Sequence, residues 1–392
     1  MTLHNTTEFS KKFGVGTAIG IGVIIGLVIV FNIGVLIKNI LLPPKIDPAN
    51  VLLGRLPQIQ FPQSTVNGNF AYSLNTVDGN LPSNFPDRLI VYPMLVPQPN
   101  LLNLKTVQGK VQTLGFVDQT GNALPQIPRG GSYYEWDEPS GIQRKIVYDT
   151  VSLNFNMTSN YLASLDVLAG KNISDQTSAF STVQNFLTSI DSLPTDLDSN
   201  LTTAPDPAND YTVAPQLYSI DSSTGKLVKT TNLQDTRVIR VDLYQQPIQY
   251  SLTAGIDGQL THFQNFDMSL PIMYPNTPAS TMEFDVASGA NQAQVMKANY
   301  YHEAVDLSSN STPDKLATYP IKSAAQAFEE LKSGKGYVAS YNGTDNQILI
   351  NKVYLAYFNS DKTQQYLMPV VVFEGQNGFF GYVSAVDDSM LQ

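Results

Sequence analysis

The chain has 392 residues, with 33 acidic against 23 basic residues and a net charge of −10 at pH 7. It contains no cysteine, which excludes disulfides, thiolate catalysis and cysteine-based metal centres. An acidic surface repels nucleic acid, whose phosphates need basic partners, so we expect no nucleic-acid partner.

The first expected element is a membrane-spanning helix over residues 13–37. This stretch reads FGVGTAIGIGVIIGLVIVFNIGVLI and holds no charged residue. At ~1.5 Å per residue, a helix of this length spans the ~30 Å hydrocarbon core of a bilayer. A cleavable signal peptide has a shorter apolar core of about 7 to 15 residues, so we expect the helix to be retained. The sequence therefore predicts a single-pass membrane protein.

The expected span carries glycines at a spacing that allows two helices to approach closely. Gly16 and Gly20, like Gly22 and Gly26, are four residues apart, which is the small-xxx-small pattern. One interpretation is self-association, or docking on the helix of a partner, through these four glycines. The other is that glycine is simply common in membrane helices. The sequence leaves both open.

The composition after the span indicates the side of the membrane on which the chain lies. Lysines flank the span on both sides, so the flanking charges decide little. Only two acidic and five basic residues precede residue 61, so the remainder carries a net charge of −13. Such a surface is repelled by the anionic cytoplasmic leaflet. We therefore expect residues 1–12 to be a cytoplasmic tail and the bulk of the chain to be extracytoplasmic.

Residues 38–63 are expected to form a stalk between the membrane and the soluble part. This segment contains prolines at positions 43, 44, 48, 57 and 62. Proline fixes φ and removes a hydrogen-bond donor, which excludes a long helix or a central strand. The segment is therefore predicted to be stiff and extended.

Residues 64–170 are expected to form a first α+β lobe. Strand-like stretches at 69–79 and 88–94 precede a helix at 101–116, whose apolar face carries Leu104, Val107, Val111 and Leu114. From Val151 to Met157 apolar and polar residues alternate, which predicts a strand with one buried face. Such alternation favours antiparallel pairing, because parallel strands are usually apolar on both faces.

Residues 171–392 are expected to form a second α+β lobe. A helix at 174–194 precedes strands at 236–252 and a strand pair within 280–307. A helix precedes strands near residues 101, 174 and 323. This recurrence predicts two related lobes in which a helix packs on antiparallel sheets.

The second lobe ends in a module at 321–386 that has the strongest local signals. Ser323 and Gln326 form a capping box, and Gly334 stands where a left-handed C-cap is needed. The helix carries an apolar stripe of Ala324, Ala327, Phe328 and Leu331. Strands follow at 348–358, 365–375 and 379–386, the last two joined by Gln376-Asn377-Gly378. A helix packed on an antiparallel meander is predicted.

The order SAAQAFEELKSGKG, INKVYLAYF, YLMPVVVFEG and GFFGYVSAV in this module resembles the C-terminal module of the YycH/YycI-type membrane-anchored regulators. It resembles PepSY-type modules more loosely. The proline-rich stalk and the LGRLPQIQFP segment depart from that pattern and are similar instead to uncharacterised single-pass bacterial membrane proteins. The resemblance implies a non-catalytic domain that binds another exported or membrane protein.

The histidines do not form a recognisable metal motif. His4, His262 and His302 are isolated, and YHEAVD at 301–306 lacks the second histidine of H-E-x-x-H. Ser223 and Lys226 satisfy S-x-x-K, but in an apparent turn and without the companion motifs of that enzyme class. We therefore predict no metal, no cofactor and no catalytic residues.

Two acidic groups leave alternatives open. Asp196, Asp198 and Asp206 could bind calcium weakly, or could simply be solvated. Glu135 and Asp137 would share one face of a strand, as a glycosidase pair could. The chain has a single tryptophan, which argues against a sugar-stacking cleft.

The sequence favours a membrane-anchored, extracytoplasmic, non-catalytic interaction or regulatory domain of the bacterial cell envelope. Its expected partners are the lipid bilayer, through residues 13–37, and a membrane or envelope protein. Two alternatives remain. One is a cell-envelope hydrolase whose site residues are scattered along the chain. The other is a structural component of an envelope or secretion complex.

Overall fold

The computed structural model describes residues 49–392 except 67, 118–119, 125, 139–140, 199–214, 257–258 and 308–315, and except the side chains of residues 250 and 252–264. The expected tail at 1–12, the span at 13–37 and the start of the stalk lie outside the described residues. Within the described part, no helix is both long and apolar enough to cross a membrane. The architecture is mixed α+β, with several sheets and few helices, as predicted.

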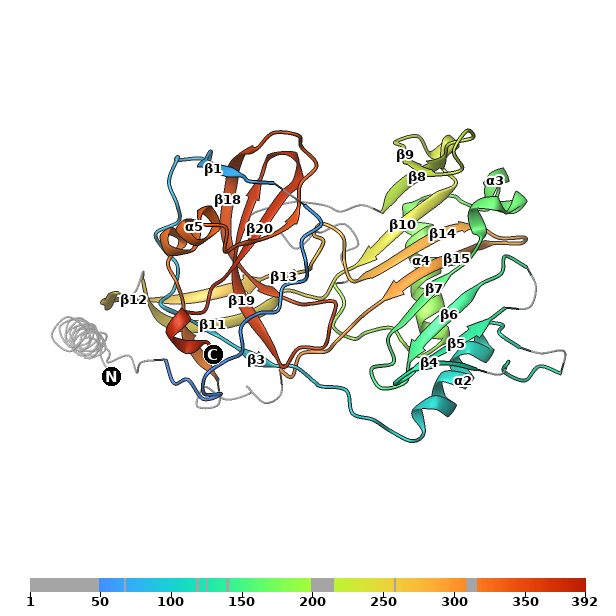
Figure 1. The fold of residues 1–392 in the computed structure, drawn as a ribbon, viewed down its shortest axis with the longest axis horizontal. Coiled ribbons are helices and arrows are strands. Elements are labelled where there is room, and N and C mark those ends of the chain that lie inside the picture. Colours follow the sequence, from blue (N-terminus) through green and yellow to red (C-terminus); the bar gives the residue numbers. More distant parts are fainter. Residues whose placement is uncertain are drawn as a thin grey trace, which may run out of the picture.

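A nine-stranded antiparallel sheet forms one lobe, on the right of Figure 1. Its strand order is β4-β5-β6-β7-β15-β14-β10-β8-β9, so that β7 and β15 join two meanders at the centre. The antiparallel pairing expected from alternation is confirmed. The strands are β4 (Ile127–Gly130), β5 (Tyr133–Asp137), β6 (Lys145–Asp149), β7 (Phe155–Thr158), β8 (Gln216–Ile220), β9 (Leu227–Lys229), β10 (Val238–Leu243), β14 (Met282–Ser288) and β15 (Ala293–Tyr300).

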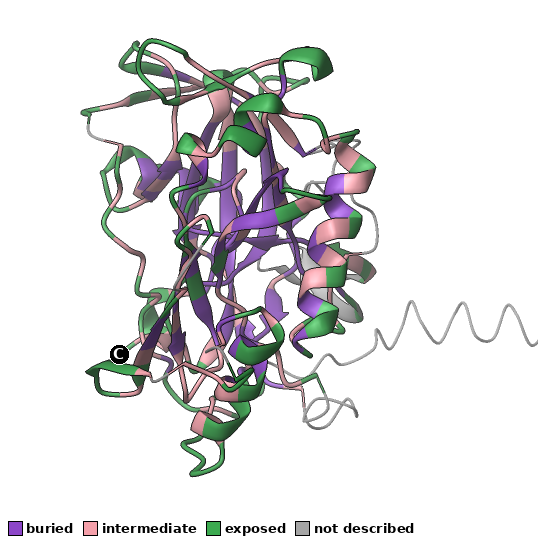
Figure 2. Cartoon of the chain, turned by 90° about the vertical axis from the view of Figure 1, so that its right-hand side faces the viewer, coloured by how far each residue is buried: buried purple, intermediate pink, exposed green. Residues whose placement is uncertain are grey.

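Two of the expected helices cover one face of this sheet. Helix α2 (Asn103–Thr113) buries Val107 and Val111, and α4 (Gln176–Ser189) buries an apolar stripe that includes Val183 and Leu187. Both stripes share a core with Trp136 and other strand residues. The short α3 (Leu165–Ala169) contributes to a separate small core. Figure 2 shows buried residues along the strands and on one side of the helices.

A seven-stranded sheet forms the C-terminal lobe, on the left of Figure 1. Its main order is β1-β18-β19-β20-β17, with β13 beside β18 and β3 beside β19. The strands are β1 (Ala71–Leu74), β3 (Tyr92–Pro93), β13 (Ile272–Met273), β17 (Tyr337–Ser340), β18 (Gln347–Phe358), β19 (Tyr366–Gly375) and β20 (Phe379–Ser384). Two smaller pairs complete the lobe: β2 (Arg88–Ile90) with β16 (Thr318–Pro320), and β11 (Ile248–Ile256) with β12 (Gln259–Leu270).

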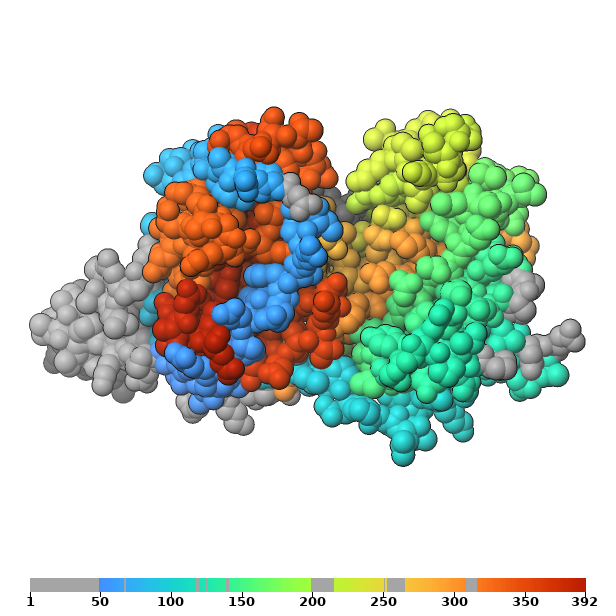
Figure 3. All heavy atoms as spheres, viewed as in Figure 1, coloured from blue at the N-terminus to red at the C-terminus, as the bar shows by residue number. Residues whose placement is uncertain are grey.

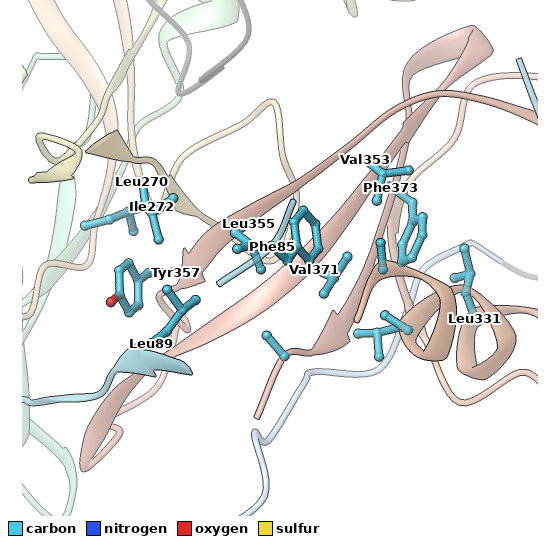
Figure 4. Close-up of a cluster of buried hydrophobic side chains, with 14 of the residues drawn as sticks. Phe85, Leu89, Leu270, Ile272, Leu331, Val353, Leu355, Tyr357, Val371 and Phe373 are labelled. Carbon is cyan, nitrogen blue, oxygen red and sulfur yellow. The ribbon is translucent and has the colours of Figure 1, made fainter. Parts of the chain in front are cut away.

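The helix of the C-terminal lobe, α5 (Ala324–Lys332), forms as predicted. Its capping box between Ser323 and Gln326 is present, and Gly334 adopts φ 78°. The stripe of Ala324, Ala327, Phe328 and Leu331 is buried. Figure 4 shows Leu331 on α5 facing the same cluster as Phe373 of β19. The three expected strands form, but β17 directly after the helix was not predicted.

The sheets divide the chain differently from the predicted boundary at residue 170. Strands β1 and β3, from the expected first lobe, join the C-terminal sheet, whereas β4–β7 share the nine-stranded sheet with β8–β10, β14 and β15. The chain therefore leaves the C-terminal lobe after β3, builds the other lobe, and returns. Alternation identifies the buried face of a strand but not its partner, because pairing is decided by distant residues.

The expected stalk is not a free spacer over its described part. Leu56 is fully buried, and it forms a parallel bridge to Leu391. The ring of Phe61 stacks on that of Tyr337, with centroids 5.1 Å apart. The prolines do exclude a helix here, but the apolar residues between them pack on the C-terminal lobe. Figure 3 shows this blue segment lying across the red and orange residues.

The strand expected from Val151 begins only at Phe155. Asp149 accepts hydrogen bonds from the backbone N–H of Val151, at 2.9 Å, and from Ser152 Oγ, at 2.8 Å. Leu153 adopts φ 61°, which lies outside the extended region of regular strands. The aspartate therefore fixes a turn between β6 and β7, and the alternation before Phe155 reflects that turn rather than a strand.

Candidate functional site

Buried polar side chains gather where the two lobes meet. The loop between β18 and β19, residues 359–365, lies there against the ends of β10 and β15. Asn154, Gln245, Glu303 and Asn359 are all at most 7% exposed. Buried polar groups are stable only when hydrogen-bonded, so their partners define the site.

His302 and Asp196 form a hydrogen-bonded pair in this region. His302 Nε2 lies 2.8 Å from Asp196 Oδ1, and the backbone N–H of His302 donates to Asn154 Oδ1 at 3.0 Å. Burial opposes the charged form of Asp196, but the hydrogen bonds from His302 and Gln245 hold the pKa of this carboxyl below its ordinary value. The ionised carboxylate only accepts, so His302 Nε2 carries a proton.

Gln245 connects this pair to the C-terminal lobe. Its Nε2 donates to Asp196 Oδ2 at 2.9 Å, and its Oε1 accepts from Asn359 Nδ2 at 2.6 Å. Its backbone N–H donates to the hydroxyl of Tyr274 at 2.9 Å. Through its side chain and its backbone N–H, Gln245 therefore joins residues of three other segments, and these hydrogen bonds hold the two lobes together.

Glu303 makes a second connection. Its Oε1 accepts from the hydroxyl of Tyr301 at 2.9 Å, and its Oε2 accepts from the backbone N–H of Gln364 at 3.3 Å. Burial raises the pKa of Tyr301, so the phenol stays protonated and remains a donor. The strand end after β15 is thereby held to the β18–β19 loop.

Beside this network lies a cavity of about 300 Å³, which we call the interlobe cleft. Strand ends and turns of the nine-stranded sheet form one side, and the β18–β19 loop forms the other. The lining residues are Tyr133, Val147, Asp149, Ser152, Asn154, Phe155, Asn156, Asn299, Tyr300 and Tyr301 on the first side, and Asp361, Lys362 and Thr363 on the second.

The amide of Asn154 is only half satisfied. Its Oδ1 accepts from His302, but its buried Nδ2 has no hydrogen-bond partner among the described residues. An unmet buried donor costs about 1–3 kcal/mol. Asn156 and Asn299, directly opposite each other on β7 and β15, are exposed and line the same cleft.

A second, larger groove of about 650 Å³ adjoins the other side of the network. Asp196 and His302 lie in its lining together with the apolar side chains of Leu95, Ile248 and Leu307. Leu95 and Leu307 are about half exposed, at 54% and 53%. The pair of His302 and Asp196 therefore lines an open groove. No hydroxyl of the described residues hydrogen-bonds the ring of His302.

The other histidines and one aspartate of the acidic loop considered from the sequence lie partly outside the described residues. Within the described part of the chain, no group of three potential ligands lies together. The side chain of His262 and the whole of Asp206 lie outside the described residues. Asp196 is engaged by His302 and Gln245 instead.

The candidate glycosidase pair is neutralised by cations. Glu135 is 2% exposed and receives hydrogen bonds from Arg129 and, at 2.8 Å, from Lys145. Lys145 also lies 3.2 Å from Asp137. Burial opposes ionisation of Glu135, but these cations hold its pKa below the ordinary value, so it is a poor general acid. Trp136, on the opposite face, is fully buried and offers no sugar-stacking surface.

The S-x-x-K match is a turn between β8 and β9. Ser223 Oγ donates to Asp221 Oδ1 at 2.6 Å, and Asp221 also accepts from the backbone N–H of Ser223. Gly225 adopts φ 67° and completes the turn. The serine hydroxyl is a structural donor here.

Sequence reasoning noted His302 and Asp196 separately but missed their contact. They are 106 residues apart, and no local pattern connects them. It also missed Asn154, Asn156 and Asn299, because polar residues on one face of a strand are ordinary. Only the closeness of β7, β15 and the β18–β19 loop distinguishes these three.

No protein-family model and no curated protein matches the chain. Among solved structures, the crystal structure of an uncharacterized protein from Eubacterium rectale is similar over 77% of this chain and 87% of that chain, at 9% identity and a TM-score of 0.32. A likeness at this level says nothing about function.

Proposed function

We propose that the chain is a membrane-anchored, extracytoplasmic, non-catalytic interaction or regulatory domain of the bacterial cell envelope. In this proposal residues 13–37 anchor it in the bilayer, and Gly16, Gly20, Gly22 and Gly26 provide a face for self-association. The two lobes are variants of one arrangement, in which a helix precedes antiparallel strands. The bound partner is another envelope or membrane protein.

The observation that carries the proposal concerns the polar side chains where the lobes meet: some are hydrogen-bonded to one another, and others have no protein partner among the described residues. The titratable side chains of His302 and Asp196 are engaged in joining the lobes through Gln245. In contrast, the amides that line the interlobe cleft have unused hydrogen-bonding capacity, and Asn154 Nδ2 is buried without a partner among the described residues. Exposed amides that have no hydrogen-bond partner among the described residues support binding rather than turnover.

The docked start of the described chain supports a position of the lobes close to the membrane. Leu56 pairs with Leu391, and only residues 38–48 separate the expected span from the described structure. An extended segment of this length reaches roughly 36 Å. The lobes would therefore lie close to the bilayer, where membrane proteins are within reach.

Two experiments on the full-length chain in cells test the proposal. Protease added to intact spheroplasts should remove the residues after 37, and full protection would contradict the location. A photo-crosslinking amino acid at position 299 should give adducts with an envelope protein, whereas the same label at position 291, an exposed asparagine in the β14–β15 turn, should give none. Equal labelling at both positions would contradict a partner at the cleft.

A further inference from the structure

We propose that the segment between β3 and α2, residues 95–102, contacts the surface of the bilayer. We call this segment the apolar loop. The inference rests on the proposed anchoring by residues 13–37, and it adds a second membrane contact in the soluble part of the chain. The partner is the interfacial region of the lipid, where headgroups meet acyl chains.

The apolar loop exposes large hydrophobic side chains. Leu101 is fully exposed, Leu102 is 66% exposed, and Leu95 and Val96 are exposed as well. Single exposed leucines are ordinary on a protein surface, but several in one short loop indicate an interaction site. Leu102 also occupies the N-cap of α2 without making a capping hydrogen bond, although Ser, Thr, Asp or Asn is preferred there. The loop therefore departs from two local preferences at the same point, which is typical of a functional surface.

The apolar loop carries no charge. The chain holds no charged residue between Arg88 and Lys105, whereas the whole chain has a net charge of −10. An acidic surface is repelled by anionic headgroups, and a charge that moves toward the hydrocarbon is costly. The loop avoids both costs. Lys105, which is exposed just beyond it, adds attraction to anionic headgroups.

The backbone of the apolar loop is suited to surroundings with little water. Pro97 and Pro99 have no backbone N–H group. Asn100 Oδ1 accepts from the backbone N–H of Leu102 at 2.9 Å, and the backbone oxygen of Asn100 accepts from the N–H of Asn103 at 3.0 Å. Backbone groups that already have a partner lose less when they leave water, so entry into the interface is less costly.

The position of the apolar loop argues for the bilayer as its partner. Figure 1 shows the blue start of the described chain and the cyan segment between β3 and α2 along the lower edge of the molecule. In Figure 3 this cyan segment protrudes from the lower face. Only residues 38–48 lie between the expected span and the described chain, and they reach at most roughly 36 Å when extended. A membrane below the molecule therefore meets both the start of the chain and the loop.

The shape of the contact also fits lipid. A protruding tip of leucine side chains needs a partner that closes around it, and the interfacial region of a bilayer does so without a preformed groove. Apolar faces that bind there enter by about 5–10 Å. Together with the anchor, this contact gives the lobes two attachment points, which fixes the face that they turn to a membrane partner.

The test uses the absence of cysteine from the chain, so that one introduced cysteine takes one fluorophore. The full-length chain with Leu101→Cys is labelled with NBD, a dye whose emission shifts to the blue in apolar surroundings, and is reconstituted in lipid vesicles. Lipids that carry a nitroxide on the acyl chain quench a dye that contacts them. We expect a blue shift at this position, and quenching that is strongest when the nitroxide lies near the headgroup.

Two matched positions provide the references. Leu165→Cys labels another exposed leucine, on α3 at the upper side of the molecule in Figure 1, and should show neither effect. Ile25→Cys labels the centre of the expected span and should be quenched most strongly by a nitroxide deep in the acyl chain. Quenching at Ile25 but not at Leu101 rejects the loop contact and leaves the anchor in place. No quenching at Ile25 rejects the anchor, and the inference with it.

Leu102→Asp, made in the chain labelled at position 101, separates membrane contact from folding. The carboxylate lies at the N-terminus of α2, whose first turn has no acidic residue, and this placement stabilises a helix. The substitution should therefore raise the urea midpoint in detergent or leave it unchanged. The blue shift at position 101 should be lost, because a carboxylate is costly in the interface. A purely structural role of Leu102 predicts the reverse, a lower midpoint with an unchanged blue shift.

Two further results would overturn the proposal. One is a dye at position 101 that reports water in the vesicles, with the same emission as the dye at position 165. The other is a blue shift that nitroxide lipids do not quench and that grows with the density of protein in the vesicle, which assigns the apolar loop to a second copy of the chain.

Discussion

Replacing Phe328 by alanine tests whether α5 rests on a real core of the C-terminal lobe. Phe328 is 8% exposed, and its ring centroid lies 5.8 Å from that of Phe373 on β19. Lys332 Nζ lies 5.2 Å from the same ring, on the solvent side. The side chain is therefore buried against the sheet at the boundary of the core rather than at its centre.

The expected cost follows from these contacts. Deletion of a buried aromatic side chain costs about 3–5 kcal/mol, depending on how far the site can relax. Because Phe328 borders solvent, the cost should lie near the lower end, at about 3 kcal/mol. The matched control is Gln326→Ala on the same helix, because Gln326 contributes to the N-terminal cap and does not pack in the core. Gln326 is exposed, and its Oε1 accepts from the backbone N–H of Ser323 at 2.9 Å. Loss of this cap should cost about 1 kcal/mol or less.

Urea unfolding of residues 49–392, followed by circular dichroism, measures both changes. Phe328→Ala should lower the midpoint about threefold more than Gln326→Ala at unchanged slope. Phe328→Leu, which keeps an apolar side chain, should fall between them. Equal losses for Phe328→Ala and Gln326→Ala would refute the conclusion that this stripe packs on the sheet.

Further predictions concern the anchor, the polar network and the docked segment. Replacing Gly20 and Gly22 by isoleucine should weaken self-association in a membrane reporter assay, and an unchanged signal would return these glycines to ordinary membrane residues. Because the folded pKa of Asp196 is lowered, its contribution to stability is present above the ordinary pKa of 3.8 and is lost as the pH falls through the lowered value. Asp196→Asn should therefore reduce the free energy of unfolding at pH 7 but not near pH 2, and an equal loss at both would contradict the stabilisation of this carboxylate by the hydrogen bonds from His302 and Gln245. Leu56→Ala should cost about 2–5 kcal/mol, since the side chain is fully buried. A cost below about 0.5 kcal/mol would show that the segment is a loose spacer after all.

The elements that sequence reasoning predicted well are those specified by neighbouring residues. The cap, stripe and end of α5 all lie within 323–334, and each forms as expected. The turn at Asn377 and Gly378 likewise adopts positive φ at both residues, 56° and 66°. Local hydrogen bonds and backbone preferences are sufficient for such features.

The features that sequence reasoning missed depend on distant residues. The pairing of β1 with β18 and of β7 with β15 could not be read from alternation, which is the same for any partner. The contact between His302 and Asp196, and the unmet amide of Asn154, exist only because the lobes meet at the β18–β19 loop. A site built from three segments has no local pattern.

The C-terminal lobe contains both the first and the last strands of the described chain, and this has a consequence for folding during synthesis. Asn75, at the end of β1, hydrogen-bonds Asn351, 276 residues later. At about 5–20 residues per second, the partner of β1 emerges from the ribosome roughly 15 to 55 seconds after β1 itself. The nine-stranded sheet, whose strands all lie between residues 127 and 300, can close in that interval. Strands β1–β3 must wait with apolar side chains such as Leu89 and Tyr92 uncovered, so chaperone dependence and aggregation on truncation should centre on the N-terminal strands.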